Sequence, residues 1–245
     1  MPPCTAWNAH RIGFTNRPIN YTFRPRQDPD RSESLRIGWL MARPRALDYL
    51  QKRALILRQS AQLFARHGYT GTSISMIAEA CGVSKALLYH YYRDKEAVLF
   101  DILHSHLTDL VTQVEAVVAV TEAGAGQLLA LGERLLDIYR DCHAEHQVQL
   151  ANLGLLAEDR QLALRALERR LVALAAEAIA AAVPSVAGTA ALKPLTLSWF
   201  GMINWHYLWF RDGRGLSRAD YARMACDLIT EGGAKAGASR NRPGG

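Results

Sequence analysis

The chain has 245 residues, 49% of them hydrophobic, and a formal net charge of +6, so it is long and apolar enough to bury a substantial core. It holds no run of about 18 apolar residues and no apolar stretch of the kind found in secretory signals, so we expect a cytoplasmic protein without a membrane span. The positive charge is concentrated in residues 41–105, where nine Lys and Arg face five Asp and Glu. That concentration predicts a polyanionic partner.

The chain begins with a segment that has no helical period. Residues 1–44 carry scattered Pro and Arg, and we expect them to form a disordered basic tail. From Leu47 to His67 apolar residues recur at helical spacing, and Gly68 is a natural stop. The sequence therefore predicts a first helix that ends at this glycine.

Two short helices follow, joined by a turn at Gly82. Thr72 or Ser73 caps the first of them, and Ser84 caps the second, because the side-chain oxygen of a Ser or Thr accepts a hydrogen bond from a backbone N–H of the first turn. Two short helices around a glycine turn predict a helix-turn-helix domain over residues 45–95.

Longer helical stretches fill residues 96–233. Asp94 caps the first of them, and Ser217 with Asp220 makes a capping-box-like start for the last, which is expected to end at Gly232 and Gly233. Residues 234–245 are expected to form a flexible tail. Neither β-alternation nor an internal repeat is visible, so the predicted fold is all-α. The expected helices cover residues 95–123, 127–142, 145–157, 160–182, 192–210 and 218–232.

The helix that begins after Ser84 has two different faces. Its apolar residues are spaced to pack on the first helix, which leaves the opposite face for a partner. A helix of this size fits the major groove of DNA, where its N-terminal residues meet base edges and Lys, Tyr and His reach phosphates. The alternative is an ordinary helical hairpin with an amphipathic surface. The outward residues are Lys85, Ala86, Leu87, Tyr89 and His90.

The stretch TSISMIAEACGVSKALLYHYYRDKEAVL, residues 72–99, resembles the N-terminal domain of the TetR family of transcriptional regulators. The markers fall in order as IAE at 77–79, GVSK at 82–85, LYHYY at 88–92 and KEAVL at 95–99. The resemblance implies that this domain binds double-stranded DNA. By position it implies DNA contacts for Ser84, Lys85, Tyr89, His90 and Lys95, with Thr72 or Ser73 on a phosphate.

The resemblance also implies that Leu88 and Tyr92 pack inward, and Tyr92 stands where Phe is more usual. Leu87 stands where a smaller or hydroxyl-bearing residue is frequent. An apolar side chain there can contact a thymine methyl but cannot donate a hydrogen bond to a base.

GMINWHYLWFRDG, residues 201–213, resembles a branch of the same family that includes repressors of phenylacetate, fatty-acid and sterol-ring degradation. The resemblance implies a homodimer and a small-molecule effector, with residues 96–233 as the effector-binding and dimerisation domain. An acyl-CoA or aryl-CoA thioester is the favoured effector class. Most aromatic residues here are expected in the core and the dimer interface. A polyanionic thioester needs cations beside an apolar cavity. The candidate effector residues are Arg134, His143, His146, Arg169, Arg170, Trp205 and Tyr207.

CHAEH, residues 142–146, sets Cys142, His143 and His146 close together, and His residues at i and i+3 of a helix can share a metal. It reads HxxH, and it is neither HExxH nor HxxEH, so the zinc-protease arrangement is absent. An exposed or pocket-lining His pair is favoured; the alternatives are a metal sensor and a His that hydrogen-bonds an effector. Catalytic Ser and phosphate-binding Gly motifs are absent, so we expect no enzyme, no metal and no cofactor.

The predicted function is therefore a ligand-responsive homodimeric repressor that binds a palindromic operator and is released by its effector. One alternative is a drug- or lipid-sensing repressor of an efflux system. Another is a non-inducible DNA-binding structural dimer.

Overall fold

The computed structural model describes residues 29–239, with side chains from 48 to 235, and every regular element in that part is helical. The predicted all-α fold is confirmed. The expectations for residues 1–28 and 240–245 lie outside the described residues.

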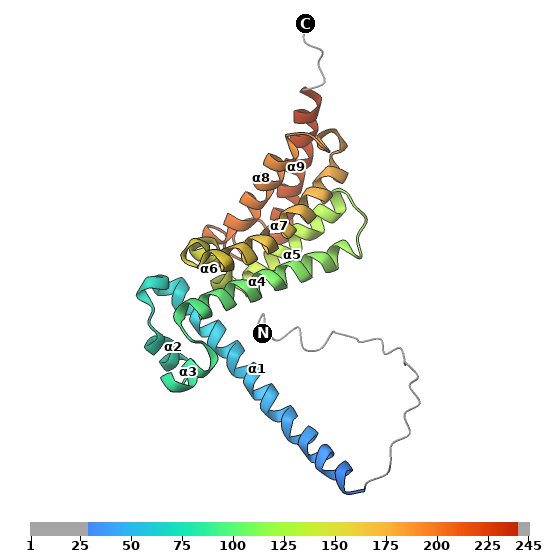
Figure 1. Cartoon of the computed structure of the whole chain (residues 1–245). Helices are drawn as coiled ribbons and strands as arrows, with labels where there is room; N and C mark the ends of the chain where they lie inside the picture. Colours follow the sequence, from blue (N-terminus) through green and yellow to red (C-terminus); the bar gives the residue numbers. More distant parts are fainter. Residues whose placement is uncertain (1–28, 240–245) are drawn as a thin grey trace.

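α1 (Pro29–Gly71) is much longer than the predicted first helix. The expectation of a tail up to residue 44 is wrong for residues 29–44, because α1 starts at Pro29 and continues through Pro44. A proline at the first helical position costs little, since its missing N–H would have no partner there. The predicted stop is present, because Gly68 has φ 75° and ψ 161° and interrupts the helix. Figure 1 shows the N-terminal half of α1 extending away from the rest of the molecule.

α2 (Ile74–Ala80) and α3 (Lys85–Tyr91) pack against α1 as the predicted helix-turn-helix. Each helix contributes a buried apolar residue to the core of this domain: Phe64 from α1, Ile77 from α2 and Leu88 from α3. The turn between α2 and α3 contains Gly82 with φ 64°, a conformation that favours glycine.

α4 (Lys95–Val118) connects the two parts of the molecule. Asp94 caps it as predicted, with its Oδ1 accepting a hydrogen bond from the Ala97 N–H at 2.7 Å. The first turns of α4 pack on α1, and its remaining length packs on α5 and α7 (Figure 1). The two domains therefore share one continuous helix.

The C-terminal domain is a bundle around Trp199, which is fully buried. α5 and α9 pack closely, as do α4 and α7. None of the helices in the described part is long and apolar enough to span a membrane. The bundle consists of α5 (Ala125–Asp141), α6 (His143–Asn152), α7 (Glu158–Ala182), α8 (Leu192–Trp205) and α9 (Arg218–Ser239), with 3-10 turns η2 (Leu153–Leu155), η3 (Pro184–Val186) and η4 (His206–Leu208).

α9 does not end at Gly232 and Gly233, so the predicted stop is wrong and the helix continues to Ser239. Gly233 serves packing instead. A Cβ on it would lie 3.3 Å from side-chain carbons of Val183 and Leu195, closer than an ordinary van der Waals contact. The glycine therefore lets α9 approach its neighbours.

Candidate nucleic-acid interface and effector site

The outward face of α3 is available to a partner. The Ser84 Oγ caps the helix and accepts a hydrogen bond from the Leu87 N–H at 3.1 Å. Lys85, Ala86, Tyr89 and His90 are exposed, and Leu87 is half-buried. Ser73 is also exposed and caps α2, accepting from the Met76 N–H at 3.2 Å. The two caps and the outward residues of α3 are those that the sequence singled out.

Two tyrosines at the end of α3 fix its orientation. Tyr92 is buried, and its hydroxyl donates a hydrogen bond to Asp101 Oδ2 at 2.5 Å. Asp101 also forms an ion pair with Arg53 of α1. Burial and the hydrogen bond to Asp101 raise the pKa of Tyr92. Tyr91 is half-buried and stacks on Tyr49, with ring centroids 4.7 Å apart. The packing of this second pair of rings holds α3 against α1 and α4.

Thr72 and Lys95, both expected on DNA, are instead bound to the backbone where α1 is interrupted. Thr72 is buried, and its hydroxyl donates to the carbonyl oxygens of Leu63 at 3.2 Å and Gly68 at 2.9 Å. The Lys95 ammonium donates to the carbonyl oxygens of Tyr69 at 2.7 Å and Thr72 at 2.8 Å. Carbonyls at a helix end need such donors. We therefore correct both assignments from a phosphate contact to support of the α1–α2 turn.

The arginines expected around an effector do not converge. Arg134 donates to Gln113 Oε1, at 2.6 Å from its Nη2, and Arg170 pairs with Glu115 at 2.8 Å. Gln113 and Glu115 are two residues apart on α4, so they point to different sides of that helix. Arg169 is exposed. The predicted cationic lining from these three residues is therefore wrong.

His143 and His146 lie near Tyr207, as a pocket assignment requires, but the two rings differ in burial. His146 is fully buried, stacks on Tyr139 with centroids 3.6 Å apart, and donates its Nε2–H to the Asn204 carbonyl at 3.0 Å. Burial lowers its pKa to about 4. His143 is exposed, and both His rings lie 5.5 Å from the Tyr207 ring. Across the described residues no group of three or more His, Cys, Asp or Glu is placed to hold a metal ion.

Trp205 is 53% exposed and lies on the outer side of α8. The structure thus removes it from the pocket, where the sequence made it a candidate. Trp205 contacts the cluster of His143, His146 and Tyr207 through the Tyr207 ring, with ring centroids 6.4 Å apart.

Two hollows lie beside this cluster, and His143 borders both. The inner cavity, about 320 Å³, lies between α1, α4 and α6. The arginine cleft, about 210 Å³, lies between the end of α5 and the loop after η4. The inner cavity is lined by residues that include Leu57, Arg58, Ile102, His106, Asp109 and Glu145, and the arginine cleft by residues that include Tyr139, Arg140, Tyr207, Arg211, Asp212 and Arg218.

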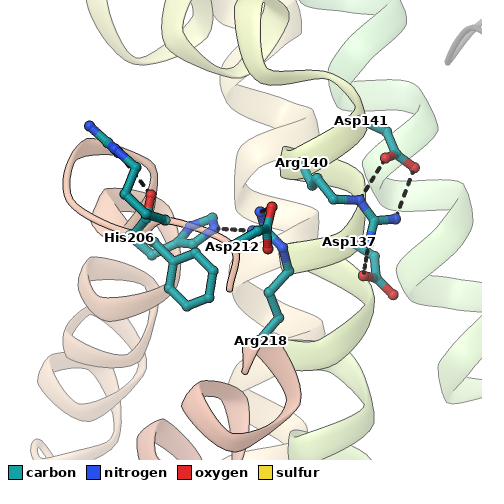
Figure 2. A network of polar contacts seen from close by, with 8 residues as sticks. Asp137, Arg140, Asp141, His206, Asp212 and Arg218 are labelled. Atoms are coloured by element: carbon teal, nitrogen blue, oxygen red, sulfur yellow. Dashed lines mark hydrogen bonds and ion pairs between the residues drawn. The ribbon is translucent and has the colours of Figure 1, made fainter. Parts of the chain in front are cut away.

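Figure 2 shows the polar network of the arginine cleft. Arg218 donates to Asp212 at 2.7 Å and to His206 Nε2 at 2.9 Å. Because that nitrogen accepts, the proton of neutral His206 lies on Nδ1, which donates to the Ile203 carbonyl at 3.0 Å. Burial is the main cause of the lowered His206 pKa.

Two further arginines complete the cleft. Arg140 pairs with Asp137 at 3.3 Å and with Asp141 at 2.9 Å (Figure 2). Arg211 donates to the Phe210 carbonyl at 2.8 Å and forms no ion pair with any described residue. Neither Arg211 nor Arg218 was among the candidate effector residues. The sequence feature that points to this part of the chain is the RDGRG loop, whose charged residues follow directly after the aromatic helix.

Comparison with known proteins decides the family. Residues 56–102 match the bacterial regulatory proteins of the tetR family, and residues 121–233 match a tetracyclin repressor-like C-terminal domain. A TetR-family transcriptional regulator from Bordetella parapertussis 12822 is 36% identical, with 72% of this chain and 93% of that chain covered and a TM-score of 0.68. The chain belongs to the TetR family of transcriptional regulators. It is therefore a DNA-binding regulator and not an enzyme.

Two other regulators are also similar to this chain. A crystal structure of AibR in complex with isovaleryl coenzyme A and operator DNA is 26% identical, with 72% of this chain and 97% of that chain covered and a TM-score of 0.65. The transcriptional repressor KstR2 from Rhodococcus jostii (strain RHA1) is 35% identical over 68 residues, 28% of this chain. The chain spans 33% of the length of KstR2 and 22% of YuxN from Bacillus subtilis (strain 168), another curated relative.

Proposed function

We propose that this TetR regulator is a homodimer that represses transcription from a near-palindromic operator and is released by a small effector. The observation that carries the proposal is the exposed face of α3, capped by Ser84 and held from behind by Tyr92 and Asp101. Twofold symmetry makes the operator near-palindromic, and binding in successive major grooves would require the two recognition helices to lie about 34–36 Å apart, one turn of DNA.

Within α3 the contacts divide by position. Lys85, Ala86 and Leu87 form the first turn, which meets base edges in the major groove, and the exposed Tyr89 and His90 are suited to phosphates. Leu87→Ala should change sequence preference, by about 1–3 kcal/mol for a good base contact, whereas Tyr89→Ala should weaken binding to all sequences alike. Gel-shift competition against a panel of operator variants measures both. If both variants lost the same affinity on every operator sequence, the division into base-reading and phosphate-binding residues would be contradicted.

The face that would bind a second copy lies on α8, η4 and α9. Five large apolar residues of this region are exposed in the single chain, and a Cβ on Gly201 of α8 would meet nothing within 4 Å. Large apolar patches on a soluble protein mark interaction surfaces, and an open glycine on a helix allows close approach of a partner helix. The exposed residues are Leu197, Trp205, Leu208, Met224 and Leu228.

For the effector we favour a CoA thioester, which the complex of the related AibR with isovaleryl coenzyme A supports. The arginine cleft offers the chemistry that such a ligand needs. Arg211 lacks a carboxylate partner among the described residues, and Tyr139, Tyr207 and Phe210 supply ring surface beside it. Arginine binds phosphate and carboxylate groups through paired N–H donors.

The test is titration of a preformed operator complex, with the operator taken from DNA flanking the gene. Release by isovaleryl-CoA or phenylacetyl-CoA but not by the free acids is expected. The response should be lost in Arg211→Gln and kept in Arg214→Gln, a matched exposed arginine of the same loop. Release by neutral lipophiles would favour an efflux repressor, and release by none a non-inducible DNA-binding dimer.

A further inference from the structure

The arginine cleft already contains an anion, which is the carboxylate of Asp212. This residue belongs to the RDGRG loop, residues 211–215, and lines the cleft together with Arg140, Arg211 and Arg218. Figure 2 shows Asp212 between Arg218 and Arg140. The hydrogen bond from Arg218 is the largest cause that lowers the pKa of Asp212, and the charge of Arg140 adds to it. The cleft therefore has the electrostatics of an anion site with an internal occupant.

Arg218 has two fixed partners and one that is removable. Its Nη1 donates to His206 Nε2 at 2.9 Å, and its guanidinium lies 4.7 Å from the centre of the Phe210 ring. Both of these partners are buried. Its Nη2 donates to Asp212 at 2.7 Å, and the Asp212 side chain is 65% exposed, whereas that of Arg218 is 16% exposed. Because exposed ion pairs contribute little to stability, the Asp212 carboxylate can leave for water while the other two partners keep Arg218 in place.

The loop that carries Asp212 is not packed into the bundle. Residues 211–217 are all exposed. Gly213 and Gly215 have φ 76° and 80°, and a Cβ on either would meet nothing within 4 Å. The turn is closed by a hydrogen bond from the Arg214 N–H to the Arg211 carbonyl at 3.2 Å. Since glycine adopts many backbone conformations, the loop can move Asp212 away from Arg218 without disturbing a core contact.

A phosphate group is better suited than Asp212 to this position. Asp212 accepts from a single nitrogen of Arg218. Arg211 also lines the cleft and forms no ion pair with any described residue. A phosphate group carries more charge than a carboxylate and has three acceptor oxygens, so it can accept from both arginines. The cleft volume of about 210 Å³ is below the usual range for a whole small-molecule ligand, so the cleft fits one anionic group of a larger molecule.

We propose that Asp212 is an internal competitor of the effector, whose carboxylate occupies the anion subsite of the arginine cleft and is displaced when a phosphate group of the ligand binds to Arg211 and Arg218. This inference rests on the proposed binding of an anionic effector in the cleft. A tethered carboxylate acts at a high effective concentration, so it lowers the apparent affinity for every anion by one common factor. Asp212 thus sets the ligand concentration at which the site fills, and filling it releases the RDGRG loop between η4 and α9.

The test measures anion binding to the full chain without DNA, by calorimetry in metal-free buffer. The probes are inorganic phosphate and inorganic diphosphate. Asp212→Asn keeps the size of the side chain and removes its charge. It should raise the affinity for both probes by the same factor, about three- to fivefold, the upper part of the range for an exposed ion pair. Equal affinities in the variant and the wild type, or no binding to either, would overturn the proposal.

The two probes separate displacement from simple repulsion. Repulsion by Asp212 would weaken diphosphate more than phosphate, because diphosphate carries more charge. A gain in Asp212→Asn that grows with the charge of the probe would therefore contradict displacement. Asp48→Asn is the matched control, since the Asp48 side chain is 60% exposed and pairs with Lys52 of α1 at 2.8 Å. This control should leave both affinities unchanged, and a gain equal to that of Asp212→Asn would contradict the assignment to the cleft.

Two arginine variants and CoA itself locate the site and its ligand. Arg211→Gln should weaken both probes about fivefold, whereas Arg214→Gln, on the same exposed loop, should not. Unchanged binding in Arg211→Gln would overturn the proposal. CoA should bind more tightly than diphosphate; weaker binding would assign the cleft to free phosphate compounds, so the effector class would fail and the displacement would stand. Operator release by a thioester at equal concentrations in wild type and Asp212→Asn would leave the effector class and overturn the displacement.

Discussion

The hydrogen bond between Tyr92 and Asp101 links the recognition helix to α4, and removing it should be measurable as a loss of stability. Tyr92→Phe keeps the ring, which is 7% exposed, and removes the hydroxyl that donates to Asp101 at 2.5 Å. A hydrogen bond to a charged group contributes about 1.5–3 kcal/mol. For a domain of this size the expected change in Tm is about 3–12 °C. The residual ion pair with Arg53 keeps Asp101 from being left without any partner.

The assay is urea unfolding followed by circular dichroism at fixed protein concentration, since the proposed dimerisation would make stability depend on concentration. Tyr89→Phe is the matched control, because Tyr89 is 52% exposed and its hydroxyl makes no hydrogen bond with a described residue. Its effect should stay within about 0.5 kcal/mol. Tyr92→Phe should move the urea midpoint with an unchanged slope. Equal midpoints for the two variants would refute the role given to this hydrogen bond.

Three other variants test neighbouring conclusions. Lys95→Met should destabilise the chain by about 1–3 kcal/mol in urea unfolding, because two carbonyls lose their donor. If stability is unchanged and the slope of log operator affinity against log salt concentration falls by about one, Lys95 contacts a DNA phosphate instead. Leu228→Glu should weaken the dimer by about 100-fold or more in light scattering, because a carboxylate would be buried without a partner, and a dimer of wild-type strength would exclude this face. Asp109→Asn should gain urea resistance over the wild type as pH rises from 4 to 7. The wild-type carboxyl has its pKa raised to about 6, so its contribution to the free energy of unfolding is complete below about pH 4 and is lost as pH rises through 6. A stability difference between variant and wild type that is constant with pH would argue against this pKa shift.

The sequence predicted the helix-turn-helix well because its signals are local. Ser73, Ser84 and Asp94 cap helices through bonds to residues three positions ahead, and such bonds can be anticipated from spacing alone. The interruption at Gly68 was visible for the same reason. These positions needed no knowledge of distant contacts.

The errors arose where tertiary contacts decide. Thr72 and Lys95 were assigned by family position, but the carbonyls that they bind become available only because α1 breaks at Gly68. The sequence predicts a helix stop at Gly233, yet the role of this glycine depends on the side chains of Val183 and Leu195 from other elements. Arg134 and Arg170 were grouped by their charge, and nothing local shows on which side of α4 their partners lie. Burial of His106 likewise depends on helices far away in the sequence.

The continuity of α4 has a mechanical consequence. Its 24 residues make a rod about 36 Å long, and no loop lies between the end that contacts the recognition helix and the end within the bundle. A tilt of about 5° at one end therefore displaces the other by about 3 Å, close to the ~3.4 Å rise of a base pair. In a dimer two such rods would tilt in opposite senses, so the displacements would add. A change in the bundle no larger than a side-chain rotation could thus carry both recognition helices out of register with the DNA grooves.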